Sequence, residues 1–301
     1  MSQDMREIAP LEIEAGALRS DRSDMPEKTF RWALFAALAV ALLTLATLLI
    51  FIFTEGWPRF NLQLFTNMPS IRLPELAGAQ SAIMGSIWVI ATTAVIALPI
   101  GIMAAIYLEE YGNSTSKFYR LVEINIQNLA AVPSIVYGIL GLGVIARALA
   151  LGQTVITAAL TLSLLVLPVI IISTREAIRA VPQSIRFGSM ALGATKWQTI
   201  WKQVLPAATP GTATGAILAL SRAIGEAAPL LLLGAVTFIT FNPNGLLSSY
   251  TVMPIQIYNW VSQSRDEFHV LAAALCIVLL MILLIMNGLA IFLRNKYQRK
   301  W

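Results

Sequence analysis

The chain has little charge and almost none of the side chains that build thiol or metal chemistry. Only 12% of its 301 residues are charged, against about 25% in an average soluble domain. It has one cysteine, Cys276, and one histidine, His269, so it offers no intrachain disulfide and no Cys- or His-based metal cluster. It also contains no Gly-Lys pair and therefore no phosphate-binding loop for ATP. This composition argues against a cytosolic enzyme.

Apolar sequence is present instead, in runs long enough to cross a membrane. Hydrophobic residues make up 57% of the chain, and the mean hydropathy is +0.73. A spanning helix needs about 20 apolar residues. Six candidate runs occur, at 33–53, 82–108, 124–146, 148–174, 207–241 and 270–293. They predict an all-α integral membrane protein with six transmembrane helices, in which Pro99, Pro133 and Pro168 favour kinks.

The basic residues predict the orientation of these helices. Most of the 21 Lys and Arg residues fall in the N-terminal tail, in the 109–123 and 175–206 connections, or at the C-terminal end. Only Arg59, Arg72, Arg147 and Arg265 fall in the opposite loops. Cytoplasmic loops carry an excess of Lys and Arg, so both termini are predicted to be cytoplasmic. We interpret the net charge of +5 as this topology signal and expect no nucleic-acid partner.

The same patterns predict the organisation of the chain. An acidic tail without a periodic apolar face, 1–30, is expected to be disordered and is followed by a first transmembrane helix at 31–55. The membrane core is expected to span 80–295, before a short cytoplasmic end at 296–301. Within the core, the turn signal Asn-Pro-Asn-Gly opens 242–269, where we predict a short external or re-entrant helix.

Two charges interrupt the fifth apolar run. Arg222 and Glu226 are four residues apart, so on a helix they project from one face and can meet. A charge at bilayer depth costs at least ~2.5 kcal/mol and usually faces a partner or a watery path. The two residues are either a structural ion pair or part of a translocation route. On such a route, the planar guanidinium can bind an anion through paired hydrogen bonds, and Glu226 would gate the route or position Arg222.

Polar residues of the third run could contribute to the same route. Ser134 follows Pro133, and Asn125, Gln127 and Asn128 precede it. Such residues either hydrogen-bond between helices or line a pathway. Arg175 and Glu176, at the end of the fourth run, are interpreted only as a positively charged cytoplasmic flank.

The 175–206 connection is long and basic, and its pattern predicts two short helices around Gly193. Thr195 and Gln198 match a capping box at the start of the second helix, and Pro206 can stop one helix and begin the next. The residues Trp197, Ile200, Trp201 and Val204 are predicted to share a helical face. That face could lie at the lipid interface or dock a separate chain, since ATP, if it drives the protein, must bind elsewhere.

The same connection resembles the EAA loop of ABC importer permeases. Gly193, Leu205 and Pro206 stand at the positions of that pattern, whereas Phe187 begins Phe-Gly-Ser in place of Glu-Ala-Ala. The Ala-Leu-Gly-Ala-Thr-Lys-Trp sequence that begins at Ala191 fits the phosphate branch of these permeases. The resemblance implies that part of this segment couples the chain to an ATPase. The residues implied are Ala191, Gly193, Ala194, Thr195, Trp197, Trp201, Leu205 and Pro206.

A second resemblance lies in the fifth run. The sequence Arg222-Ala-Ile-Gly-Glu226-Ala-Ala-Pro-Leu is similar to the signature of PstA-type subunits of the phosphate importer, with Ala227 replacing the usual Thr. Similarity extends over about 80–293 and includes the Val-Pro-Ser-Ile-Val-Tyr-Gly sequence that ends at Gly138. The resemblance implies a type I ABC importer (MetI-like) permease fold in the bacterial inner membrane, a substrate pathway with Arg222, Glu226 and Ser134, and import of inorganic phosphate.

The resemblance also implies partners for this chain. They are a PstC-like permease, two copies of a PstB-like ATPase that bind ATP and Mg, an external PstS-like phosphate-binding protein and a PhoU-like regulator. We expect no cofactor and no catalysis in the chain itself. Three alternatives stay open: a permease for another oxyanion such as molybdate or sulfate, an ion-gradient secondary transporter, and a membrane-embedded enzyme.

Overall fold

The computed structural model describes residues 24–113, 115–235 and 238–297. The chain divides into two compact units, Met1–Phe51 and Ile52–Trp301. Most of helix α1 (Asp24–Gly56) belongs to the first unit. Because α1 begins at Asp24, the predicted boundary of the tail at residue 30 is too late. The rest of the predicted tail, 1–23, and the terminal residues 298–301 lie outside the described residues.

The second unit is built from helices and short connections. Its elements are η1 (Trp57–Arg59), α2 (Leu62–Thr66), η2 (Pro74–Leu76), α3 (Gln80–Ile106), η3 (Tyr107–Tyr111), α4 (Lys117–Ala131), α5 (Ser134–Leu140), η4 (Gly141–Ala148), α6 (Val155–Arg179), α7 (Gln183–Ala191), α8 (Lys196–Thr199), η5 (Ile200–Val204), α9 (Leu205–Ile224), α10 (Ala228–Leu232), α11 (Met253–Val261) and α12 (Asp266–Tyr297). The elements η1 and η2 are 3₁₀-helical, whereas η3, η4 and η5 are π-helical.

Within the described residues, five helical segments are long and apolar enough to cross a membrane. They are α1, α3 with η3, α6, α8 through α9, and α12. The α4 helix and the α5–η4 segment pass the same test only as a pair that bends by 102°, and together they make a sixth candidate. The predicted all-helical fold with six candidate spans is confirmed, but the third span is broken.

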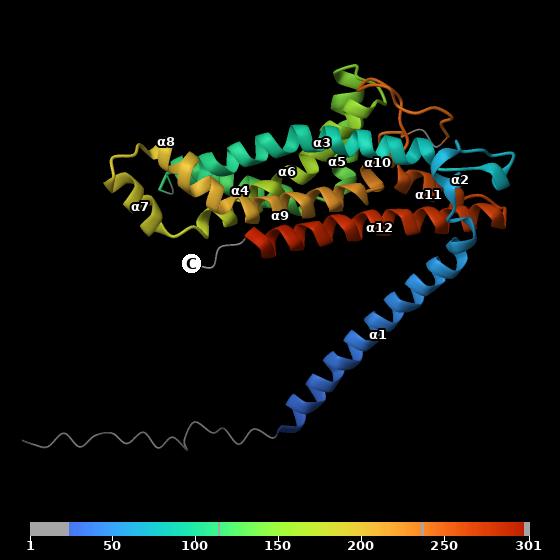
Figure 1. The fold of residues 1–301 in the computed structure, drawn as a ribbon, viewed down its shortest axis with the longest axis horizontal. Coiled ribbons are helices and arrows are strands. Elements are labelled where there is room, and N and C mark those ends of the chain that lie inside the picture. Colours follow the sequence, from blue (N-terminus) through green and yellow to red (C-terminus); the bar gives the residue numbers. More distant parts are fainter. Residues whose placement is uncertain (1–23, 114, 236–237, 298–301) are drawn as a thin grey trace, which may run out of the picture. The chain divides into compact units, whose positions relative to one another are not determined.

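The long helices α3, α6, α9 and α12 lie side by side, with α7 and α8 at one end and α2 and α11 at the other (Figure 1). The contact between α3 and α6 is lined by small residues of α3, including buried Ala97, Gly101 and Ala105. A Cβ at Gly101 would lie 2.7 Å from Cγ2 of Ile170. Small residues let membrane helices approach closely and gain van der Waals contact, so this seam holds the centre of the bundle.

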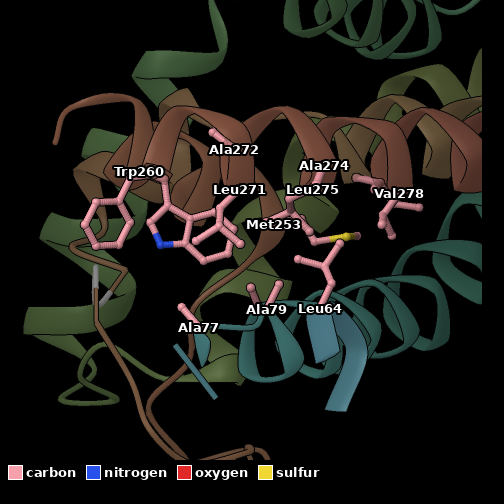
Figure 2. Packing of buried hydrophobic residues seen from close by; sticks show 13 residues of the cluster. Leu64, Ala77, Ala79, Met253, Trp260, Leu271, Ala272, Ala274, Leu275 and Val278 are labelled. Carbon is pink, nitrogen blue, oxygen red and sulfur yellow. The ribbon is translucent and has the colours of Figure 1, made fainter. Parts of the chain in front are cut away.

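An apolar cluster closes the end of the bundle opposite α7. Figure 2 shows Leu64 of α2, Met253 and Trp260 of α11, and Leu271 and Leu275 of α12 packed together. The backbone N–H of Met253 donates to Ser86 Oγ of α3 at 2.9 Å. The short helix predicted within 242–269 is confirmed as α11, and it is packed into the unit by this cluster.

Three predicted spans differ from the structure. The third breaks at Pro133, because proline lacks an N–H donor and forces the preceding residue, here Val132, into an extended conformation. The fourth begins at Val155 and not at 148, since the chain turns after η4. The fifth ends at Ile224 and not at 241, and the chain is irregular at 225–227 before Pro229 enters the first turn of α10. Pro99 and Pro168 lie inside α3 and α6, as predicted.

Candidate functional site

The ion pair Arg222–Glu226 forms across the end of a helix. Glu226 lies beyond the last residue of α9, so the prediction that both side chains project from one continuous helix is wrong. The turn nevertheless brings Arg222 Nε to within 3.4 Å of Glu226 Oε1. This distance exceeds the usual 2.7–3.2 Å for an N–H···O bond, so Glu226 holds the guanidinium only loosely.

The guanidinium of Arg222 is accessible. Its side chain is 60% exposed, whereas that of Glu226 is 17% exposed. Among the described residues, Arg222 makes no hydrogen bond through its two terminal nitrogens. A planar cation with free donors in a fork can bind an oxyanion in a bidentate manner. The geometry thus suits transient binding of an anion by Arg222, with Glu226 at its side.

Ser134 lies at the break of the third span, close to the same helix end. It is the first residue of α5 and is partly buried. Val132, just before the break, packs on a cluster that contains Tyr137 of α5 and Ala219 and Ala223 of α9. The structure therefore places the break next to the turn of α9 that carries Arg222. No hydrogen bond joins Ser134 to that pair in the described part of the chain.

The two short helices that follow these breaks pack on each other. A Cβ at Gly138 of α5 would lie 2.7 Å from Cα of Pro229 in α10, so the two backbones are in close contact. The hydroxyl of Tyr137 donates to the carbonyl of Leu129 at 2.8 Å and so satisfies an acceptor at the end of α4. Asn125 donates to the Leu121 carbonyl of its own helix, a bond within α4 and not between helices.

The predicted pair of short helices around Gly193 is confirmed as α7 and α8. Gly193 has a φ of +84°, a conformation that favours glycine. The N–H of Gly193 donates to Met190 O and that of Ala194 to Ser189 O, the two bonds of a Schellman motif that ends α7. The capping box of Thr195 and Gln198 is also formed, and it begins α8.

The residues assigned to coupling lie mainly on the surface of this segment. Ala191, Gly193, Thr195, Trp197, Trp201 and Pro206 are exposed, and Ala194 and Leu205 are partly buried. The predicted shared face is wrong, because Ile200 and Val204 are buried whereas the two Trp side chains are more than half exposed. These Trp rings meet edge to face with centroids 5.3 Å apart. An exposed aromatic pair suits either lipid or a docked protein.

Pro206 does not end a helix. The chain stays helical from Lys196 to Ile224, with Pro206 in the first turn of α9. The π-helical turn η5 (Ile200–Val204) immediately precedes it. A π turn widens the hydrogen-bond pattern from i+4 to i+5 and accommodates local disruption of a helix. Pro206 lies in the first turn of α9, as predicted, but α9 begins one residue earlier at Leu205, and the predicted stop before the proline is wrong.

An ionic network that no local sequence pattern indicates lies beside this segment. Arg175 of α6 is 8% exposed at its side chain and pairs with Glu109 of η3 and Glu123 of α4 at 3.4 and 3.0 Å. It also donates to the Tyr119 hydroxyl at 2.9 Å. Arg175 is therefore a buried member of an ion-pair network, which its interpretation as a positively charged flank did not include. Its partners come from distant parts of the sequence, which no local pattern indicates.

A second buried pair joins η3 to α7. Arg186 Nη2 lies 2.8 Å from Glu110 Oε1, and the two side chains are 10% and 8% exposed. A cavity of about 310 Å³ lies beside this pair, lined among others by Glu109, Arg179 and Lys196. Among the described residues no cluster of three or more His, Cys, Asp or Glu side chains could hold a metal ion.

These features define a class of protein. The chain combines apolar helices long enough to span a membrane with an accessible cation at the break of one of them. It also has an exposed pair of short helices at one end. This combination is that of the membrane component of a transporter.

The comparisons with known proteins identify the family. The sequence profile of the binding-protein-dependent transport system inner membrane component matches residues 97–296. The phosphate transport system permease protein PstA 1 of Mycobacterium tuberculosis is 33% identical over 250 residues, covering 81% of this chain and 80% of that protein. PstA of Mycobacterium leprae is 34% identical over 257 residues and 82% of each chain. The chain belongs to the binding-protein-dependent transport system inner membrane component family.

Solved structures with low sequence identity share the fold. A chain of the MetNI methionine ABC transporter superposes with a TM-score of 0.56 at 18% identity, covering 73% of this chain and 97% of that one. A chain of a bacterial alginate ABC transporter superposes with a TM-score of 0.63 at 15% identity, covering 91% and 98%. The expected MetI-like ABC permease fold is confirmed, and the chain is a multi-pass membrane permease subunit.

Proposed function

We propose that this chain is the permease subunit of an inorganic phosphate importer and forms one half of the translocation path. The observation that carries the proposal is the accessible Arg222 guanidinium at a break within a membrane bundle, in a chain one-third identical to PstA proteins over most of its length. A forked, permanently charged donor matches phosphate oxygens. Glu226 acts as a gate or positions Arg222, and Ser134 contributes a polar atom from the neighbouring break.

The proposal includes the partners. A PstC-like permease covers the exposed side of Arg222, so that the anion is enclosed between the two chains. A PstB-like ATPase dimer binds ATP and Mg and docks on the exposed residues of α7 and α8, and a PstS-like protein delivers phosphate on the outer side. A PhoU-like regulator completes the proposed set. Closure of the ATPase dimer moves α7 and α8, and the permeases then open alternately to the two sides.

Phosphate uptake by the assembled complex in proteoliposomes tests the proposal. Removing a hydrogen-bonded charge costs about 1.5–3 kcal/mol, so Arg222→Leu should lower uptake at limiting phosphate at least tenfold. Glu226→Gln should alter the rate less. Arg265→Leu is the matched control, because Arg265 also pairs loosely with a neighbouring carboxylate, that of Glu267 at 3.5 Å, but lies in the connection between α11 and α12.

The controls also address the choice of anion. Excess sulfate or molybdate should leave uptake of labelled phosphate unchanged, whereas competition by either would favour another oxyanion as the substrate. Uptake without ATP would favour a gradient-driven transporter. Normal phosphate uptake by both Arg222→Leu and Glu226→Gln would contradict a pathway through this pair.

A further inference from the structure

Two adjacent glutamates at the end of α3 bind different elements. Both lie in η3, the π turn that follows α3. Glu109 pairs with Arg175 and Arg179 of α6 at 3.4 and 3.0 Å. Glu110 pairs instead with Arg186 of α7. The end of α3 is therefore bonded to the core through one residue and to the coupling segment through the next.

Arg186 makes four bonds from one buried guanidinium. Its Nε and Nη2 donate to Glu110 Oε1 at 3.1 and 2.8 Å. Nη2 also donates to the carbonyl of Ile178 at 3.0 Å, and Nη1 donates to that of Val181. Carbonyls at the C-terminal end of a helix lack hydrogen-bond donors within that helix. Arg186 therefore also supplies a donor to a carbonyl at the end of α6. Arg186 thus joins α7, α6 and η3 at one point.

Lys196, the first residue of α8, adds a second link to the same turn. Its Nζ donates to the main-chain carbonyl of Glu110 and lies 4.8 Å from the centroid of the Tyr111 ring. Ser189 of α7 and Thr199 of α8 are joined by a hydroxyl–hydroxyl bond of 2.9 Å. We call Glu110, Arg186 and Lys196 the Glu110 cluster. It bonds both short helices to the end of α3.

The energetics of such a pair favour a positioning role over a stabilising one. Desolvation of two charges often cancels their attraction, so a buried ion pair adds little stability compared with apolar residues of similar size. Loss of one partner nevertheless leaves an uncompensated buried charge. The Glu110 cluster therefore fixes the position of α7 and α8 against α3 without being needed to fill a core. Phe187, at the position where the EAA pattern has Glu, is 64% exposed and takes no part in it.

The end of α3 is well placed to pass a displacement on. α3 packs most extensively on α6, and α6 in turn has its next most extensive contact with α9, the helix that carries Arg222. We infer that the Glu110 cluster makes α7, α8 and the end of α3 move as one body, so that displacement of the short helices reaches the bundle through α3. Glu110 and Arg186 are positioning residues in this inference, which rests on the proposed coupling to an ATPase.

Distance measurements in the assembled transporter test the inference. In a Cys276→Ser background, spin labels at Leu192→Cys and Tyr107→Cys report the separation of the α7–α8 turn from η3, since these side chains are 91% and 62% exposed. The separation should stay constant between the resting complex and the complex trapped with ATP and vanadate. Adding Glu110→Gln should broaden the distribution or shift it on trapping.

Transport per ATP hydrolysed gives the functional readout. Glu110→Gln should leave copurification of the ATPase and its hydrolysis rate intact while uptake per ATP falls roughly tenfold, a typical coupling factor. Arg186→Lys keeps the positive charge but not the several donors of the guanidinium. It should lower uptake per ATP less than Glu110→Gln does. The matched control is Glu176→Gln, which removes an ion pair between Glu176 and Arg179 within α6. The two atoms are 3.4 Å apart, and the side chains of Arg179 and Glu176 are 53% and 65% exposed. This variant should leave uptake per ATP unchanged.

Each outcome decides for or against the inference. A wild-type separation that changes by several ångströms on trapping, or a Glu110→Gln variant as tightly coupled as Glu176→Gln, would overturn it. Failure of both Glu110→Gln and Arg186→Lys to assemble would also overturn it, because the cluster would then serve folding alone. The distances are measured on the coupling segment, with no transport substrate added to the complex. A failure of the phosphate assignment therefore shows in wild-type uptake and leaves the distances unaffected.

Discussion

Single side chains decide how closely the two broken spans approach each other. Gly138 of α5 lies against the backbone of Pro229, so an added methyl group meets atoms that cannot rotate away. Gly143, in the π turn η4 that follows α5, has no atom within 4 Å of its Cβ position. The two glycines thus differ in surroundings while being five residues apart.

This difference gives a stability prediction. Gly138→Ala should destabilise the protein by about 1–3 kcal/mol, the usual cost of overpacking. Gly143→Ala, the control, should be neutral or slightly stabilising, since alanine is favoured over glycine in helices by about 1 kcal/mol. Thermal unfolding of the purified chain in detergent measures both. Equal midpoints for the two variants would contradict the close contact of α5 and α10.

At the same scale, some side chains were predictable and others were not. Arg222 and Glu226 stood out because a charge in an apolar run is rare and costly. Arg175 did not, because it lies at the end of a run, where basic residues are ordinary. Its burial depends on Glu109 and Glu123, brought to it by folding from 66 and 52 residues away.

At the scale of elements, long helices followed from the sequence and their breaks did not. A run without charge predicts a span, but it contains no information on whether the helix is continuous. Pro133 was expected only to kink its helix, whereas the observed bend is 102°. α9 ends at Ile224, and the α10 helix that follows packs against α5, a tertiary contact that the apolar pattern does not indicate. Sequence patterns predicted those features that depend on neighbouring residues alone, such as the capping box of Thr195 and Gln198.

The break between α4 and α5 has a hydrogen bond that can be removed alone. Tyr137→Phe deletes the hydroxyl that donates to the Leu129 carbonyl and should cost about 1 kcal/mol of unfolding free energy. Tyr258→Phe is the control, because the Tyr258 side chain is 56% exposed on α11. Hydrogen exchange at α4 and α5 should rise in Tyr137→Phe only. Unchanged exchange there would show that the bond does not hold the break.

At the scale of the whole molecule, the positions of the basic residues predict its orientation in the membrane. Single cysteines placed in a Cys276→Ser background can report it. Leu247→Cys lies in the connection between α10 and α11, and Asn295→Cys near the carboxyl end of α12; both sites are exposed. An impermeant maleimide should label Leu247→Cys in intact cells and Asn295→Cys only after the membrane is opened. Labelling of both from one side would refute the predicted topology.

The carboxyl end of α12 runs toward the same end of the bundle as α7 and α8 (Figure 1). The Thr214 hydroxyl of α9 donates to the Ala290 carbonyl of α12 at 3.4 Å, so the last turns of α12 lie against the half of α9 that follows α8 and η5. A purification tag or fluorescent fusion placed directly after α12 would therefore start beside the surface where a nucleotide-hydrolysing neighbour is expected to sit. Affinity tags for isolating the intact transporter are therefore better placed on another subunit.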